Sequence, residues 1–108
     1  MKFVKALKLS DILDGKMKKV TIESLDVLLI NRNGSIYALS DKCPHLGGSL
    51  SKGVLEKNNI KCPNHGAEFD IKTGKCVFDA KILFINMKVV DAKTYQVKIE
   101  GDDILVGI

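Results

Sequence analysis

The sequence has no tryptophan, a single arginine, two prolines, two histidines and three cysteines among its 108 residues. Long apolar runs are also missing, since the longest, Val27–Ile30 and Ile82–Ile85, contain only four residues each. A membrane-spanning helix needs about 20 consecutive apolar residues. Lysines interrupt the apolar pairs of residues 1–8, which excludes the hydrophobic region of a signal peptide. The sequence therefore predicts a cytoplasmic protein with no membrane partner.

Arginine contributes almost nothing to the positive charge of the chain. The 17 lysines and arginines exceed the 13 acidic residues, which gives a formal net charge of +4, but Arg32 is the single arginine. Proteins that read base edges use arginine side chains and a concentrated basic stripe, whereas these lysines are scattered. This pattern predicts no nucleic-acid partner. The excess of lysine indicates at most an acidic protein partner, attracted over a distance.

Turn residues divide the chain into short segments typical of β-strands. Its length and its 45% apolar residues suit one globular domain over residues 1–108. The expected strands are Lys2–Lys8, Lys18–Glu23, Asp26–Arg32, Ser35–Leu39, Asn59–Cys62, Glu68–Ile71, Ile82–Val90, Thr94–Glu100 and Ile104–Gly107. The sequence thus predicts an all-β fold with antiparallel connections.

Several short segments carry signals for turns. The pairs expected to form tight turns are Asn33-Gly34, Thr73-Gly74 and Gly101-Asp102, because these residue types tolerate the backbone angles that such turns require. One helical turn is expected over Ser10–Asp14, with Ser10 as its cap and Gly15 at its end.

The scarce residue types gather in two loops, residues 41–51 and 62–67. These loops contain both prolines, both histidines and two of the three cysteines. The first reads Cys43-Pro44-His45-Leu46-Gly47-Gly48 and the second reads Cys62-Pro63-Asn64-His65-Gly66, with sixteen residues between His45 and Cys62. Each loop offers one thiolate and one imidazole, which together make four metal ligands. We therefore predict that Cys43, His45, Cys62 and His65 bind a metal.

The grouping of these ligands bears on which metal is bound. Small structural zinc sites generally place a cysteine pair before a histidine pair, whereas each loop here mixes one cysteine with one histidine. A [2Fe–2S] cluster with cysteines on one iron and histidines on the other fits this mixing, and zinc is the alternative. The loop glycines suit either metal, because they let backbone N–H groups approach sulfur.

The two loop motifs, with Phe69-Asp70 and Thr73-Gly74 downstream, resemble a Rieske-type [2Fe–2S] ferredoxin over nearly the whole chain. The resemblance implies a Rieske-like fold of three antiparallel sheets, with a small cluster-binding subdomain of two loops at about residues 41–76. It also implies one cluster per chain, with Cys43 and Cys62 on the inner iron and His45 and His65 on the outer, more exposed iron. The residues that would surround the cluster are Pro44, Leu46, Gly47, Gly48, Pro63, Asn64 and Gly66.

Departures from the resemblance indicate its soluble, low-potential branch. Rieske proteins of respiratory and photosynthetic complexes link their two loops by a disulfide, but Gly48 and Asn64 occupy those positions here. The hydroxyl side chains that bond toward sulfur in those proteins are replaced by Ala67 and Phe69. The membrane anchor of those proteins is missing as well. The proline usual after the Thr-Gly turn is also missing, which leaves the path of residues 76–80 open.

The resemblance implies a one-electron carrier rather than an enzyme, with no catalytic residues of its own. It would pass electrons from an NAD(P)H-dependent reductase to a terminal oxygenase, such as a ring-hydroxylating dioxygenase. One alternative is the small Rieske subunit of another redox enzyme, of the nitrite reductase or arsenite oxidase type. Another is a zinc-stabilised interaction module. A further alternative is a redox-responsive regulator that uses Cys76, although an incidental or buried thiol is the more common case.

Overall fold

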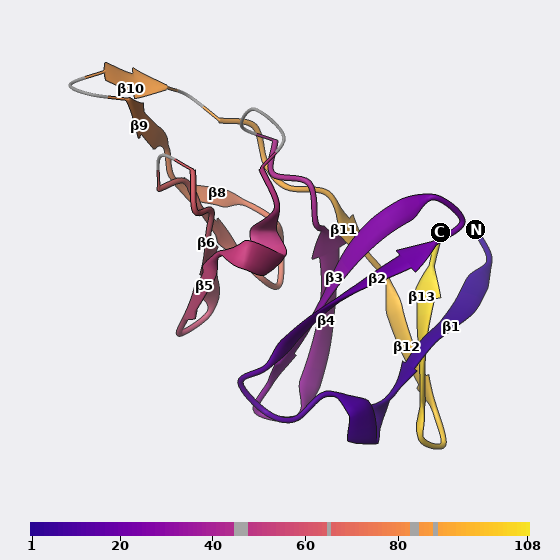
Figure 1. Cartoon of the computed structure of the whole chain (residues 1–108). Coiled ribbons are helices and arrows are strands. Elements are labelled where there is room, and N and C mark those ends of the chain that lie inside the picture. The colour runs from indigo at the N-terminus through magenta and orange to yellow at the C-terminus, as the bar shows by residue number, and fades with distance from the viewer. Residues whose placement is uncertain (45–47, 65, 83–84, 88) are drawn as a thin grey trace.

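Strands make up nearly all the regular structure in the computed structural model, which describes residues 1–44, 48–64, 66–82, 85–87 and 89–108 (Figure 1). The strands of these residues are β1 (Phe3–Lys8), β2 (Met17–Ile22), β3 (Leu25–Arg32), β4 (Ser35–Ser40), β5 (Val54–Glu56), β6 (Asn59–Lys61), β7 (Glu68–Asp70), β8 (Cys76–Phe78), β9 (Ala80–Ile82), β10 (Ile85–Met87), β11 (Thr94–Tyr95), β12 (Val97–Glu100) and β13 (Asp103–Gly107). Two short 3-10 turns, η1 (Leu9–Asp11) and η2 (Leu50–Lys52), follow β1 and precede β5. No helix in the described ranges is long and apolar enough to cross a membrane.

Three antiparallel sheets form the body of the chain. Their strand orders are β11-β4-β3-β2, β1-β13-β12 and β5-β6-β7-β8. In Figure 1 the first two sheets lie near both termini, and the third lies on the other side of the molecule. The hairpin β9–β10 makes a further two-stranded sheet, whose strands pair only with each other within the described ranges. The predicted all-β class with three antiparallel sheets is confirmed.

Strand β3 lies between two hydrophobic cores. All four residues of the apolar run Val27–Ile30 are fully buried. Val27 and Leu29 belong to the core that includes β13, whereas Leu28 and Ile30 belong to the core that includes both loop cysteines. Because neighbouring side chains of a strand point to opposite faces, an unbroken apolar run supplies both cores at once.

The predicted hairpin turns are confirmed. Asn33 and Gly34, with φ of 55° and 86°, connect β3 to β4. The register of these two strands runs without interruption from Val27↔Ser40 to Arg32↔Ser35. Gly74 and Gly101 also have positive φ, 77° and 59°, where β7 leads into β8 and β12 into β13.

The two cysteine loops start from strands that are anchored in sheets. The first loop begins directly after β4, an inner strand between β3 and β11, and it returns through η2 into β5. The second loop connects β6 to β7, which pair over three residues. The central pair, Ile60 and Phe69, is fully buried. Each loop is therefore held at its base by strand pairing.

The C-terminal third of the chain departs from the predicted strands. The single strand expected over Ile82–Val90 is wrong, because β9 ends at Ile82 and β10, which starts at Ile85, pairs back against it as a hairpin. The strand expected over Thr94–Glu100 is divided at Gln96, since β11 pairs with β4 and β12 pairs with β13. The carbonyl of Gln96 accepts the N–H of Gly107 (2.9 Å). The chain thus passes from one sheet to another where a continuous alternation of residue types predicts one strand.

Three shorter elements also differ. Strands β5 and β8 occupy segments where the sequence predicts no strand. The predicted cap at Ser10 is wrong, because η1 starts after Lys8 and contains Ser10. The N–H of Lys8 donates instead to the Asp11 carboxylate (3.1 Å). The Asp11 carboxylate thus accepts the N–H of the residue that precedes the turn, as the acid of a capping box does.

Candidate metal centre

The two cysteine loops close in the same way. The backbone N–H of Cys43 donates to the carbonyl of Gly48 (N···O 2.6 Å), and that of Cys62 donates to the carbonyl of Ala67 (2.7 Å). Each bond joins the cysteine to the residue five positions further along the chain. A proline follows each cysteine and biases it toward an extended backbone. The two cysteines therefore hold equivalent positions at the start of their loops.

Both cysteine side chains are withdrawn from solvent. Cys43 and Cys62 are each 1% exposed and belong to the same hydrophobic core. Leu50, near the end of the first loop, and Phe69, which follows the second, are fully buried in that core. The apolar surroundings keep water away from the two cysteines, which suits thiolates that must stay bound to a metal.

The two loops meet at Gly48. A Cβ atom built on Gly48 would lie 2.6 Å from Nδ2 of Asn64 and 3.4 Å from Sγ of Cys62. Only a residue without a side chain fits there unless Asn64 moves away. Gly48 and Asn64 are also the residues predicted to stand where Rieske proteins of respiratory and photosynthetic complexes have a disulfide. The structure places them against each other, beside one of the predicted sulfur ligands.

We expect Gly48→Ala to weaken metal retention, and an accompanying Asn64→Ala to restore it. The added methyl group would displace the Asn64 amide from its position beside Cys62, and over-packing of this kind costs about 1–3 kcal/mol. The measurement is the decay of visible absorbance under a chelator in both single variants and the double variant. Decay in the double variant as fast as in Gly48→Ala would show that the Asn64 contact is not the cause.

The structure brings together part of the predicted site. Besides the two cysteines, the residues it describes are Pro44, Gly48, Pro63, Asn64 and Gly66. The predicted residues outside the described ranges are His45, Leu46, Gly47 and His65. The two imidazole ligands therefore stay a prediction, and no three His, Cys, Asp or Glu side chains among the described residues form a group able to hold a metal ion. The donor set fits nonetheless, because two buried thiols in equivalent loops match the two thiolates of a mixed-ligand [2Fe–2S] centre.

A buried carboxylate at the base of the first loop was not predicted. Asp41 is 3% exposed. Its carboxylate accepts hydrogen bonds from the Ser49 hydroxyl (2.6 Å) and from the Ser51 backbone N–H (2.7 Å). The sequence does contain a signal, an acid two residues before the cysteine and two serines near the end of the same loop. Those residue types are so common in loops that the pattern alone indicates nothing about burial.

Cys76 lies outside both loops. It is in β8, opposite Phe69 of β7, and its Sγ lies 3.3 Å from the carbonyl oxygen of Phe78. Burial, and after it the negative charge of Asp79, raises the pKa of the Cys76 thiol above its usual value. A thiol that stays protonated at neutral pH is a weak nucleophile. The geometry therefore disfavours the alternative in which Cys76 is a redox sensor.

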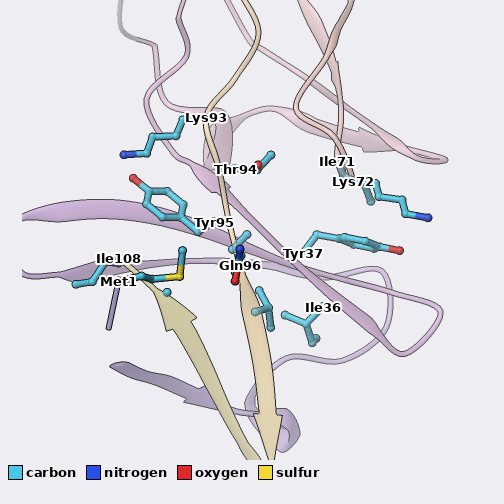
Figure 2. A pocket seen from close by; sticks show the side chains of 13 residues that line it. Met1, Ile36, Tyr37, Ile71, Lys72, Lys93, Thr94, Tyr95, Gln96 and Ile108 are labelled. Carbon is cyan, nitrogen blue, oxygen red and sulfur yellow. The ribbon is translucent and has the colours of Figure 1, made fainter. Parts of the chain in front are cut away.

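A cavity of about 780 Å³ lies apart from the two loops (Figure 2). Figure 2 shows Tyr95 and Lys93 on one side of it and Tyr37 and Lys72 on the other. Among the described residues, its lining contains no histidine, cysteine, aspartate or glutamate and no residue of either cysteine loop. The cavity adds no metal ligand and no carboxylate or imidazole to the predicted site.

Two buried thiols at equivalent loop positions, in an all-β chain, fit the class of protein that binds an iron–sulfur centre. Comparison with known proteins identifies the family: the Rieske [2Fe-2S] domain matches residues 2–81, and the chain belongs to this family. Membership confirms the predicted [2Fe–2S] cofactor.

Individual relatives are similar over their whole length. The ferredoxin component of the naphthalene 1,2-dioxygenase system of Pseudomonas putida is 36% identical over 108 residues, covering 100% of this chain and 97% of the relative. The ferredoxin component of biphenyl 2,3-dioxygenase of Rhodococcus jostii is 34% identical over 108 residues, covering 100% and 94%. The predicted identity of the chain as an electron carrier rather than an enzyme is thereby confirmed.

Solved structures of ferredoxins have the same fold as this chain. The ferredoxin of carbazole 1,9a-dioxygenase from Nocardioides aromaticivorans superposes with a TM-score of 0.82 at 27% identity, covering 99% of this chain and 98% of that one. A ferredoxin-type chain in a complex of reduced oxygenase and oxidized ferredoxin of carbazole 1,9a-dioxygenase gives a TM-score of 0.81 at 25% identity, covering 97% and 92%.

Proposed function

We propose that this chain carries single electrons from an NAD(P)H-dependent reductase to the terminal oxygenase of a ring-hydroxylating dioxygenase system. The observation that carries the proposal is the pair of equivalent cysteine loops, in a chain similar from end to end to ferredoxin components of dioxygenase systems. The similar complex of an oxygenase with a ferredoxin supports an oxygenase as the electron acceptor.

We place the protein in the cytoplasm, where NAD(P)H is available to such a reductase. Cys76 supports this location. It is a partly buried thiol outside any disulfide, and free thiols are typical of reducing compartments.

In this proposal Cys43 and Cys62 hold the inner iron, and His45 and His65 hold the outer iron. When bound, the [2Fe–2S] cluster supplies a reversible one-electron oxidation and reduction. The chain itself keeps the two thiolates away from water and holds the two loops against each other at Gly48. We take residues 1–108 as a single domain in which about residues 41–76 form the cluster-binding subdomain, supported by the β5-β6-β7-β8 sheet.

We expect a midpoint potential near the low end of the Rieske range, which runs from about −150 to +300 mV. Hydrogen bonds to the sulfur atoms raise the potential, because they stabilise the more negative reduced state. Ala67 and Phe69 are fully buried and offer no O–H group. A redox titration measures the potential, and Phe69→Tyr, which adds an O–H, is expected to raise it. A wild-type value in the upper half of the range would contradict the expectation.

The proposed function is tested by measuring the cluster and its reactions on the same preparation. Iron and acid-labile sulfide per chain, with an EPR spectrum of the dithionite-reduced protein, establish whether the cluster is present. Reduction by an NADH-dependent reductase, followed by oxygenase turnover that depends on the added chain, would support the proposal. Negligible iron and sulfide would overturn it, and a colourless zinc protein would restore the interaction-module alternative. Co-purification of a large redox subunit would favour the small-subunit alternative instead.

A further inference from the structure

Hydrogen bonds around Asp41 close the base of the first cysteine loop. Asp41 directly follows β4, and its side chain is 4% exposed. Oδ2 accepts the Ser49 hydroxyl (2.6 Å), and Oδ1 accepts the Ser51 backbone N–H (2.7 Å). The two serine hydroxyls are in turn 2.8 Å apart. The N–H of Leu50 donates to the backbone carbonyl of Asp41 (2.7 Å). The residue that enters the loop is thus tied to three residues that leave it.

This network is the first of three successive links between the two stems of the loop. Beyond the bond between Asp41 and Leu50, Lys42 and Ser49 form an antiparallel bridge, and the N–H of Cys43 donates to the carbonyl of Gly48. Since consecutive Cα atoms are about 3.8 Å apart, the Cα atoms of Asp41 and Cys43 lie within about 8 Å of each other. Hydrogen bonds that hold the two sides of the loop together at Asp41 therefore restrict the position of the Cys43 backbone, from which its side chain extends.

The carboxylate charge of Asp41 has little compensation from the described residues. Its ion pair there is with Lys19, whose Nζ lies 4.0 Å from Oδ2. The same Nζ lies 4.0 Å from Oδ2 of Asp26, so the lysine is shared between two carboxylates. The Lys19 side chain is 45% exposed, whereas that of Asp41 is buried. Water screens a buried charge much less than an exposed one, so the field of Asp41 extends into the core beside Cys43.

We propose that Asp41 is a positioning residue for Cys43 and that its buried negative charge makes the cluster harder to reduce. The inference rests on the proposed function, because it takes Cys43 as a ligand. The positioning follows from the hydrogen bonds that join the loop stems. The effect of the charge follows from electrostatics, since adding an electron close to an existing negative charge is unfavourable, more so in surroundings of low dielectric constant.

Two substitutions of Asp41, made in the cluster-loaded protein, separate its positioning role from the effect of its charge. Asp41→Asn removes the charge but keeps an oxygen for the Ser51 N–H and can donate its amide to the Ser49 hydroxyl. It is expected to raise the midpoint potential while retaining the cluster. Asp41→Ala removes both hydrogen-bond acceptors. It is expected to speed the decay of visible absorbance under a chelator by roughly tenfold, the range seen when residues that orient metal ligands are replaced.

Two substitutions in the neighbourhood give the controls. Lys19→Gln removes the cation and leaves Asp41 in place, so the midpoint potential should fall. Asp26→Asn is the matched control for Asp41→Asn, because both carboxylates lie 4.0 Å from the same Nζ. The Asp26 side chain is 49% exposed and accepts a hydrogen bond from Thr21, outside the loop. Asp26→Asn should leave the rate of decay unchanged and should change the potential less than Asp41→Asn does, because the Asp26 carboxylate is half exposed and water screens its charge.

Each outcome decides one part. A midpoint potential of Asp41→Asn equal to that of the wild type overturns the role of the charge. A decay rate of Asp41→Ala equal to that of the wild type overturns the positioning role. If Asp41→Ala does not fold, Ser49→Ala, which deletes one donor to the carboxylate, gives the same comparison with a smaller increase in rate. Absence of iron and sulfide from the wild-type protein would instead be a failure of the proposed function.

Discussion

Replacing Cys62 with alanine is expected to abolish cluster binding, whereas replacing Cys76 with alanine is expected to leave it intact. Cys62 is 1% exposed, shares a core with Cys43 and lies beside Gly48, where the two loops meet. Cys76 lies in β8, outside both loops, with its thiol near the carbonyl of Phe78. A mixed-ligand [2Fe–2S] centre is bound by only two thiolates, so removing one leaves its iron with a single protein ligand. The loss in Cys62→Ala should therefore be complete rather than partial.

Iron and acid-labile sulfide per chain, together with the visible spectrum, measure this difference. Cys76→Ala is the matched control because it deletes the same functional group from the chain without touching either loop. Full iron and sulfide in Cys62→Ala would show that the assignment of Cys62 as a ligand is wrong. Loss of the cluster in Cys76→Ala would point to the thiol in β8 as a ligand.

Replacing Gly53 with alanine is expected to destabilise the fold by about 3 kcal/mol, at the upper end of the cost of over-packing. Gly53 directly precedes β5, and a Cβ atom there would overlap the carbonyl oxygen of Lys61 in β6 and lie 3.2 Å from that of Leu50. Both neighbours are backbone atoms, so no side-chain rotation relieves the contact. The strands β5 and β6 would have to separate, and Lys61 directly precedes Cys62. The cluster should therefore be lost more readily as well.

Gly34→Ala supplies the comparison for Gly53→Ala. A Cβ atom on Gly34 would meet nothing within 4 Å, but the residue has a φ of 86°. A side chain in that conformation costs about 1 kcal/mol. Chemical denaturation of the two variants measures both free energies of unfolding. Equal losses would show that the contact of Gly53 with the β6 backbone contributes nothing beyond the general effect of replacing a glycine.

The sequence was most informative where the signal is local and the residue types are scarce. The hairpin at Asn33-Gly34 was predictable, because both residues had to adopt a positive φ and few other residue types do so readily. The presence of two matched cysteine loops was predictable in the same way, since both prolines and two of the three cysteines gather there. The equivalence of the two closures, Cys43 to Gly48 and Cys62 to Ala67, appears only in the structure.

The features that the sequence did not predict depend on contacts between distant residues. Nothing local marks Gln96 as the point where the chain leaves the sheet of β4 for that of β13. The mostly apolar residues 82–90 suit one strand as well as they suit the end of β9 followed by β10. Asp41 is an ordinary loop acid by type, and only the return of Ser49 and Ser51 to its carboxylate makes it a buried residue.

The position of β3 between two cores has a consequence for how the molecule responds to its cofactor. Leu28 and Ile30 pack on the side of the loop cysteines, and Val27 and Leu29 pack on the side of β13, although they alternate along one strand. Unfolding of β3 would therefore remove buried side chains from both cores. A cofactor that binds only the native state raises the free energy of unfolding. Because β3 belongs to both cores, we expect cofactor binding at the loops to stabilise the core near the termini as well.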